Sequence, residues 1–66
     1  MRKFQVMFRY GFYLNGHFYG QHFDSVDIYL EEGEKANSNT FNEKLEEVVL
    51  ESQRCPEAMS WSLIEE

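Results

Sequence analysis

The chain has 66 residues, and its six lysines and arginines stand against twelve aspartates and glutamates, so the formal net charge is −6. This length predicts a single domain, 1–66, near the lower limit for one hydrophobic core, because so short a chain buries only about 60% of its unfolded surface. The acidic balance argues against a protein that wraps duplex nucleic acid, which needs clustered cations.

Residues 4–30 predict an aromatic β-hairpin that turns at Asn15-Gly16, a common sequence signal of a tight turn. Along the first strand, apolar side chains occupy alternate positions, the period of a strand with one buried face: Phe4, Val6, Phe8, Tyr10 and Phe12. The opposite parity is also apolar: Met7, Tyr13, Tyr19, Phe23 and Tyr29. One helix can cover only one face of so small a sheet, so we expect the second face to meet a partner.

The register of this hairpin poses a conflict. A strict two-residue turn pairs Leu14 with His17. It then places Val26 and Ile28 on the face opposite the series that begins at Phe4. Two buried sets would therefore lie on opposite sides of the same sheet, which a one-residue change in register corrects.

A three-residue loop, with Gly16 in the left-handed bulge position, removes this conflict and is the register we expect. Phe18 then joins the core face. Tyr19 lies on the other face, across from Gly11, where an aromatic ring stabilises a weak strand position. A bulge at Gly20 is the competing solution.

Residues 31–39 form a polar link, and the segment that follows predicts one helix. Residues 40–43 (TFNE) match a capping box with Thr40 as the N-cap. Apolar residues then recur at helical spacing through Phe41, Leu45 and Val48. Pro56 is expected to end the helix. Carboxylates occupy most of its other side: Glu43, Glu46, Glu47 and Glu51.

Residues 58–64 alternate cleanly and predict a third strand with Met59, Trp61 and Leu63 facing inward. A right-handed helical crossover makes the second and third strands parallel. The simplest sheet places the first strand in the middle, antiparallel to both neighbours. The predicted fold class is therefore α+β, a three-stranded mixed sheet (ββαβ, order 2-1-3) with one helix packed on one face. The opposite face stays open.

The chain contains no strong catalytic or metal-binding signature. His22 and Asp24 lie two apart on one strand and share a face, but no third ligand stands at a fixed spacing. Cys55 is expected at the end of an acidic helix, where the helix dipole disfavours a reactive thiolate, so burial is the better expectation. A domain this thin has little room for a water-excluding pocket. We therefore predict no cofactor, no metal and no enzymatic activity.

Residues 9–14 (RYGFYL) resemble the aromatic sheet motif of RNA-recognition domains. The match covers six residues and has an extra tyrosine, Tyr10, between the basic residue and the glycine. The chain is also shorter than that fold and lacks its first helix. The resemblance implies base stacking, so a nucleic-acid accessory protein that uses Arg2, Lys3 and Arg9 with the aromatic sheet face is the alternative function.

The preferred prediction is a small, acidic protein–protein interaction module that occludes a partner surface. The partner is a target protein or a second copy, which would form a homodimer through the open sheet face. This size and charge are typical of accessory or inhibitor proteins, including those of bacteriophages and mobile elements. The residues expected to anchor the partner are apolar: Met7, Tyr13, Tyr19, Phe23 and Tyr29. The helix carboxylates Glu43, Glu46, Glu47 and Glu51 would steer it.

The sequence also favours a cytoplasmic location. Cys55 is the only cysteine, so an internal disulfide is impossible, and a reducing compartment is the default. No apolar run is long enough to span a membrane, and no charged-then-apolar leader is recognisable. We therefore expect no membrane association.

Overall fold

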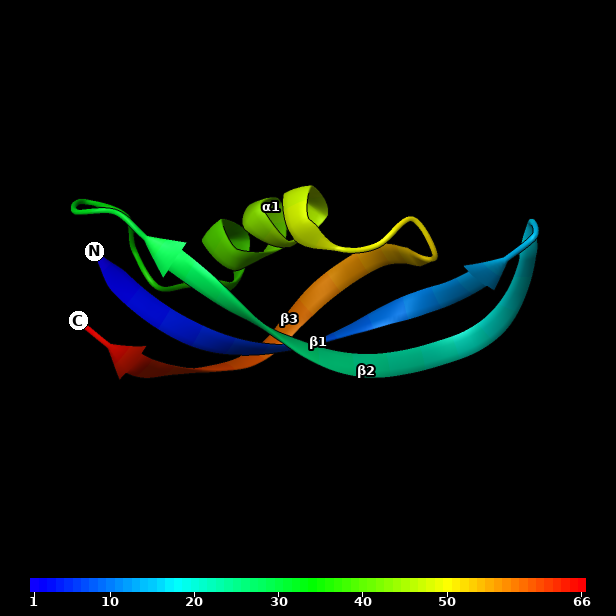
Figure 1. Ribbon diagram of the computed structural model, residues 1–66, viewed down its shortest axis with the longest axis horizontal. Helices are drawn as coiled ribbons and strands as arrows, with labels where there is room; N and C mark the ends of the chain where they lie inside the picture. Colours follow the sequence, from blue (N-terminus) through cyan, green and yellow to red (C-terminus); the bar gives the residue numbers. More distant parts are fainter.

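The computed structural model describes all 66 residues as a three-stranded sheet with one helix against one face (Figure 1). In chain order the elements are β1 (Arg2–Leu14), β2 (His17–Leu30), α1 (Ser38–Val48) and β3 (Gln53–Glu65). The strand order is β2-β1-β3, and β1 runs antiparallel to both neighbours. The predicted α+β fold and its 2-1-3 order are confirmed.

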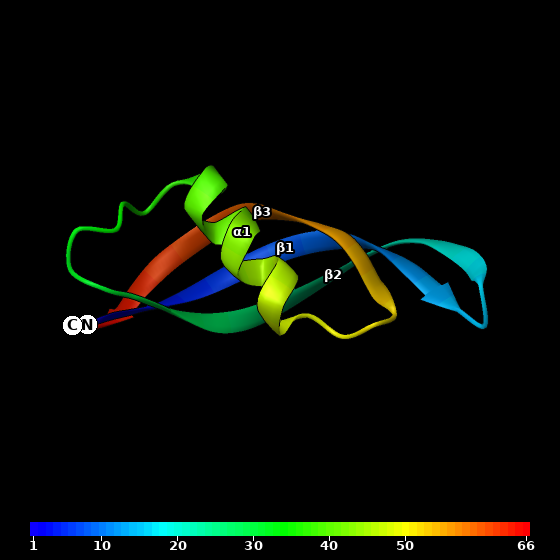
Figure 2. The same cartoon turned by 90° about the horizontal axis from the view of Figure 1, so that it is seen from above.

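The molecule is elongated, 39 × 16 × 15 Å, because its strands are 13–14 residues long. Both chain ends lie at one end of the sheet and the β1–β2 turn lies at the other (Figure 1). Seen from above, α1 lies over the part nearer the termini, and the hairpin tip extends past the turn between α1 and β3 (Figure 2). The hairpin tip is therefore not covered by the helix.

The core lies between α1 and the face of the sheet that it covers. Eight buried apolar residues form it: Phe4, Val6, Phe8, Ile28, Leu30, Phe41, Leu45 and Ala58. The ring of Phe41 packs edge-on against Phe4, with ring centroids 5.4 Å apart, and lies 5.0 Å from Trp61. The predicted inward parity of β1 and the helix stripe at Phe41 and Leu45 are confirmed. Val48, which was expected to continue that stripe, is 51% exposed.

The helix ends earlier, and β3 begins earlier, than predicted. α1 stops at Val48 because Val49 adopts extended backbone angles, φ −74° and ψ 159°. Pro56 therefore does not end the helix. It lies within β3, where an edge strand tolerates a residue without an amide proton. Glu51 lies in the turn between α1 and β3, not on the helix where it was expected.

Gln53 holds this turn in place from within. Its side-chain carbonyl accepts a hydrogen bond from the Leu50 amide at 3.0 Å, and its side-chain amide donates to Asp24 of β2 at 3.0 Å. Both ends of this buried polar side chain are thus satisfied. Because Asp24 is 29 positions away along the chain, no local pattern predicts this early turn.

The interior register of β3 also differs from a regular alternation. β3 shifts three times against β1, and at one shift Met59 is the extra residue. Ala58 therefore enters the core in place of Met59, which is 54% exposed. Trp61 packs against the core as predicted. Leu63 lies opposite Phe4 but remains 45% exposed at the end of the strand.

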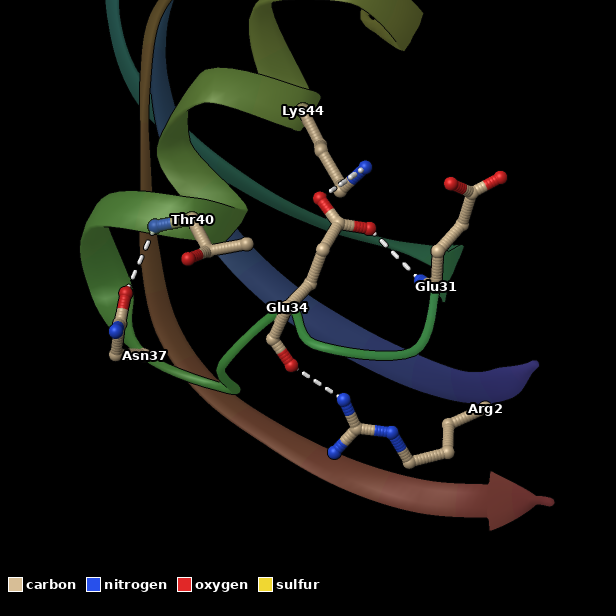
Figure 3. Close-up of polar contacts among 6 residues, drawn as sticks. All are labelled: Arg2, Glu31, Glu34, Asn37, Thr40 and Lys44. Carbon is tan, nitrogen blue, oxygen red and sulfur yellow. Dashed lines mark hydrogen bonds and ion pairs between the residues drawn. The ribbon is translucent and has the colours of Figure 1, made fainter.

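The helix begins at Ser38 with Asn37 as its N-cap, so Thr40 is not the cap. The Asn37 side-chain oxygen accepts a hydrogen bond from the Thr40 amide at 2.9 Å (Figure 3). The backbone amide of Thr40 is thus one of the first-turn amides without a partner inside the helix, and the side chain of Asn37 accepts its hydrogen bond. Asparagine ranks among the best N-cap residues, so it competes successfully with the capping box that begins three residues later.

Asn37→Ala should lower the free energy of unfolding by about 1 kcal/mol, because it removes the N-cap acceptor. Thr40→Ala should change it by only a few tenths of a kcal/mol, since alanine retains the amide that is capped and favours the helix interior. Urea denaturation of both variants, followed by circular dichroism, measures the difference. A larger loss for Thr40→Ala than for Asn37→Ala would contradict this cap assignment.

The link between β2 and α1 is held by Glu34 (Figure 3). Its carboxylate accepts a hydrogen bond from the Glu31 amide at 2.8 Å and pairs with Lys44 at 3.1 Å. Its backbone carbonyl accepts a hydrogen bond from the guanidinium of Arg2. The Glu31 amide, followed by Lys44, holds the pKa of Glu34 below its ordinary value. Arg2 and Lys44 are therefore engaged in holding the fold.

Candidate protein interface on the open sheet face

The β1–β2 hairpin turns through Asn15 and Gly16, whose φ angles are +52° and +81°. Leu14 pairs directly with His17, so the turn has two residues and the predicted three-residue loop is wrong. The register shifts instead within β2 at Gly20, which has φ +97°. The competing solution, a bulge at Gly20, is the one that the chain adopts.

This bulge decides which side of the sheet the neighbouring aromatic residues occupy. Tyr19 turns to the helix side, where its ring lies 5.9 Å from that of Phe12. Phe18 lies on the opposite side, paired with Tyr13 at 5.2 Å. The expected positions of Tyr19 and Phe18 were both wrong, because the extra residue at Gly20 reverses the alternation toward the turn.

The side of the sheet away from α1 is called the open face below. It carries a row of large apolar side chains from β1 and β2: Met7, Tyr13, Phe18, Phe23 and Tyr29. Except for the half-buried Tyr13, each is more than half exposed, and Phe23 reaches 64%. Four of the five residues predicted to anchor a partner thus lie on this face, and the fifth, Tyr19, does not.

Charged groups on the open face balance one another. Three cations and three carboxylates lie on it: Lys3, Arg9, Arg54, Asp27, Glu57 and Glu65. Lys3 lies 3.7 Å from Asp27, and Arg9 lies 2.8 Å from Glu57. The phenol of Tyr29, and then Asp27, raise the pKa of Lys3 above its ordinary value. The open face is therefore electrically neutral in a chain whose net charge is −6.

A hollow of about 270 Å³ interrupts the open face where the central strand carries Gly11. Arg9, Arg54 and the rings of Tyr13 and Phe18 are among its lining groups. A β-carbon added at Gly11 would lie only 3.2 Å from Phe18 and 3.3 Å from Tyr13. Phe18, not Tyr19, is therefore the ring that covers this glycine.

Arg54 is the residue of this site that sequence reasoning missed. It faces Gly11 across the sheet, and its guanidinium carbon lies 4.9 Å from the ring centre of Tyr13. Because the helix was expected to end at Pro56, residue 54 was not assigned to a strand, and its pairing with Gly11 was not predicted. A bulge at Cys55 interrupts the alternation of side chains along β3. Counting back from Trp61 therefore does not predict which face Arg54 occupies.

The predicted pair His22 and Asp24 does share a face, on the helix side of β2. The imidazole of His22 stacks on Tyr10 at 6.1 Å, and Asp24 accepts the hydrogen bond from Gln53. Nowhere in the 66 residues do three or more histidine, cysteine, aspartate or glutamate side chains gather closely enough to hold a metal. Cys55 is exposed in β3, so its expected burial at a helix end was wrong.

The predicted acidic cluster is divided between two elements. Glu43, Glu46 and Glu47 lie exposed on α1, and Glu51 lies exposed in the turn that follows it. The helix and the open face are on opposite sides of the sheet (Figure 1). One flat partner surface cannot contact both, so the two predicted docking surfaces are separate.

Comparison with known proteins gives no lead, because no protein-family model, no curated protein and no solved structure matches this chain. The function has to be inferred from the side chains described above. The chain also has no helix that is long and apolar enough to cross a membrane.

Proposed function

We propose that the chain is a small, non-enzymatic protein–protein interaction module that docks through its open face. One observation carries this proposal: an entire face of the sheet is left without a covering layer, and Met7, Phe18, Phe23 and Tyr29 are more than half exposed on it. Apolar patches rimmed by charged groups mark interaction sites. Aromatic residues and methionine are enriched where protein interfaces are most deeply buried.

The neutrality of the open face supports the same role. Its ion pairs, such as Arg9 with Glu57, already satisfy much of the charge that docking would remove from water. The excess negative charge lies elsewhere, including Glu43, Glu46 and Glu47 on α1, where it would steer a partner that carries positive charge. An accessory or inhibitor protein would act in this way, by covering an apolar surface of its target. A second copy is one possible target, since a twofold axis would place the open face against itself.

Phe23→Ser tests this proposal, because it removes the most exposed ring of the open face. We expect it to lose binding partners, or concentration-dependent dimerisation, while the thermal midpoint stays close to that of the native chain. Val48→Ser is the matched control: Val48 is 51% exposed but lies on the helix. Affinity capture from the source cells and light scattering over a concentration series read out both variants.

Loss of the partner in Val48→Ser, with Phe23→Ser unaffected, would contradict docking through the open face. Equal loss in both variants would point to a general effect of surface apolarity and would contradict it as well. A dimer dissociated by Phe23→Ser alone identifies the partner as a second copy.

The alternative, nucleic-acid binding, has weaker support in the arrangement of cations. Arg2 donates to the Glu34 carbonyl, and Lys3 and Arg9 each lie against carboxylates. These groups would have to leave their partners to contact phosphates. Binding of a single-stranded oligonucleotide that weakens steeply with salt would favour this alternative.

A further inference from the structure

Arg54 is the one cation of the open face without a carboxylate partner. Lys3 lies beside Asp27, and Arg9 donates to Glu57. The guanidinium of Arg54 instead lies over the ring of Tyr13, with 4.9 Å between the guanidinium carbon and the ring centre. A cation–π contact does not use up the N–H donors of a guanidinium, so these remain available to an acceptor.

Arg54 is one of the residues that line the hollow around Gly11. The rings of Tyr13 and Phe18 cover Gly11 of the central strand, within 3.3 Å of where its β-carbon would lie, and form a wall of the hollow. Small-molecule pockets measure about 300–1,000 Å³, so a hollow of about 270 Å³ is suited to one side chain of a docking protein.

The charge of the hollow selects the kind of side chain. Two guanidinium groups, Arg9 and Arg54, and one carboxylate, Glu57, line it, so it carries one net positive charge in a chain of net charge −6. A monoanion neutralises this charge, whereas a phosphate dianion would leave the filled hollow with a net charge of −1. A planar carboxylate also fits the parallel N–H groups of arginine in a two-point contact.

We propose that the hollow around Gly11 binds the carboxylate of an aspartate or glutamate side chain from a partner protein. Arg54 donates the hydrogen bonds, and Tyr13 and Phe18 contact the aliphatic part of that side chain. The inference rests on the proposed function, because it names the chemistry of the segment that the open face would capture.

The test is a nuclear magnetic resonance titration of the whole chain with N-acetylglutamate N-methylamide. The matched probe is N-acetylglutamine N-methylamide, which has the same shape without the charge. We expect saturable shifts at the amides of Gly11, Phe18 and Arg54 with the glutamate probe only. Arg54→Gln should weaken this binding at least tenfold, and Arg54→Lys should weaken it less, because lysine keeps the charge but loses the planar fork.

Lys35→Gln is the control variant, since Lys35 is an exposed cation in the link between β2 and α1 and its loss changes the net charge equally. Equal weakening by Lys35→Gln and Arg54→Gln would overturn the proposal, as would equal shifts with both probes. Tighter binding of inorganic phosphate at the same amides would overturn the assignment to a carboxylate.

Two results separate this inference from the proposed function. Absence of probe binding, combined with partner loss in Phe23→Ser, overturns the carboxylate subsite and leaves docking through the open face intact. Probe binding at Gly11, combined with full partner retention in Phe23→Ser, supports the subsite and contradicts the wider docking surface. If the glutamate probe binds and Arg54→Gln abolishes dimerisation, the carboxylate belongs to a second copy, which overturns capture of a different protein.

Discussion

Phe41→Ala should lower the free energy of unfolding by about 3–5 kcal/mol, the usual loss for a buried phenylalanine. Phe41 is fully buried between the sheet and the helix and contacts the rings of Phe4 and Trp61. At about 0.05–0.15 kcal/mol per residue, a domain of this size has a total stability of roughly 3–10 kcal/mol. The variant should therefore lose roughly a third or more of its stability, which urea denaturation followed by circular dichroism would measure.

Val48→Ala is the matched control for this prediction, because Val48 lies on the same helix but is half exposed. Its loss should stay below about 1 kcal/mol, mostly through reduced apolar contact. If Phe41→Ala retains a cooperative transition within about 1 kcal/mol of the native chain, the packing of α1 on the sheet as described here is wrong.

The sequence predicted the elements whose burial repeats locally. Phe4, Val6 and Phe8 alternate on β1, and Phe41 and Leu45 lie one helical turn apart, so each pattern records which side meets the core. The central position of β1 followed from its apolar character and from the helical crossover, which makes β2 and β3 parallel and lets β1 lie antiparallel between them. The alternation on β1, the helix stripe and the strand order could be predicted because each depends only on one segment or on the order of segments along the chain.

The register of the hairpin could not be predicted in the same way. A one-residue slip exchanges the two faces of a strand. Here both faces of the hairpin are aromatic, so either register would bury a similar amount of apolar surface near the turn. The choice between a loop at Gly16 and a bulge at Gly20 therefore depended on backbone geometry, which the sequence pattern does not contain.

The ends of α1 were missed for related reasons. Asn37 and Thr40 are both good cap residues, and the choice between them depends on where the link from β2 ends. The early C-terminus depends on Gln53, whose side chain bonds Asp24 of β2. The helix was predicted to extend past residue 54, which in the structure belongs to β3. For this reason neither the position of Arg54 on the open face nor the hollow that it lines was predicted.

Gly20→Val should lower the free energy of unfolding by about 1–3 kcal/mol, the cost of holding a side chain in a rare backbone region. Gly20 has φ +97°, and no atom lies within 4 Å of where its β-carbon would be. The loss would therefore come from the backbone and not from a collision. Gln21→Val is the control, because Gln21 is exposed on the next position of β2 and pairs regularly with Gly11. Urea denaturation measures both variants.

The bulge also positions the aromatic residues of the site, so Gly20→Val has a second expected effect. If the variant removes the bulge, the contact between Tyr19 and Phe12 should disappear from nuclear Overhauser spectra, and Phe18 should leave Gly11. Glutamate-probe binding at the hollow would then be lost in molecules that remain folded. A stable variant that keeps the Tyr19–Phe12 contact would show that a left-handed glycine is not what fixes the register. The two faces of the hairpin would then have to be determined by packing alone.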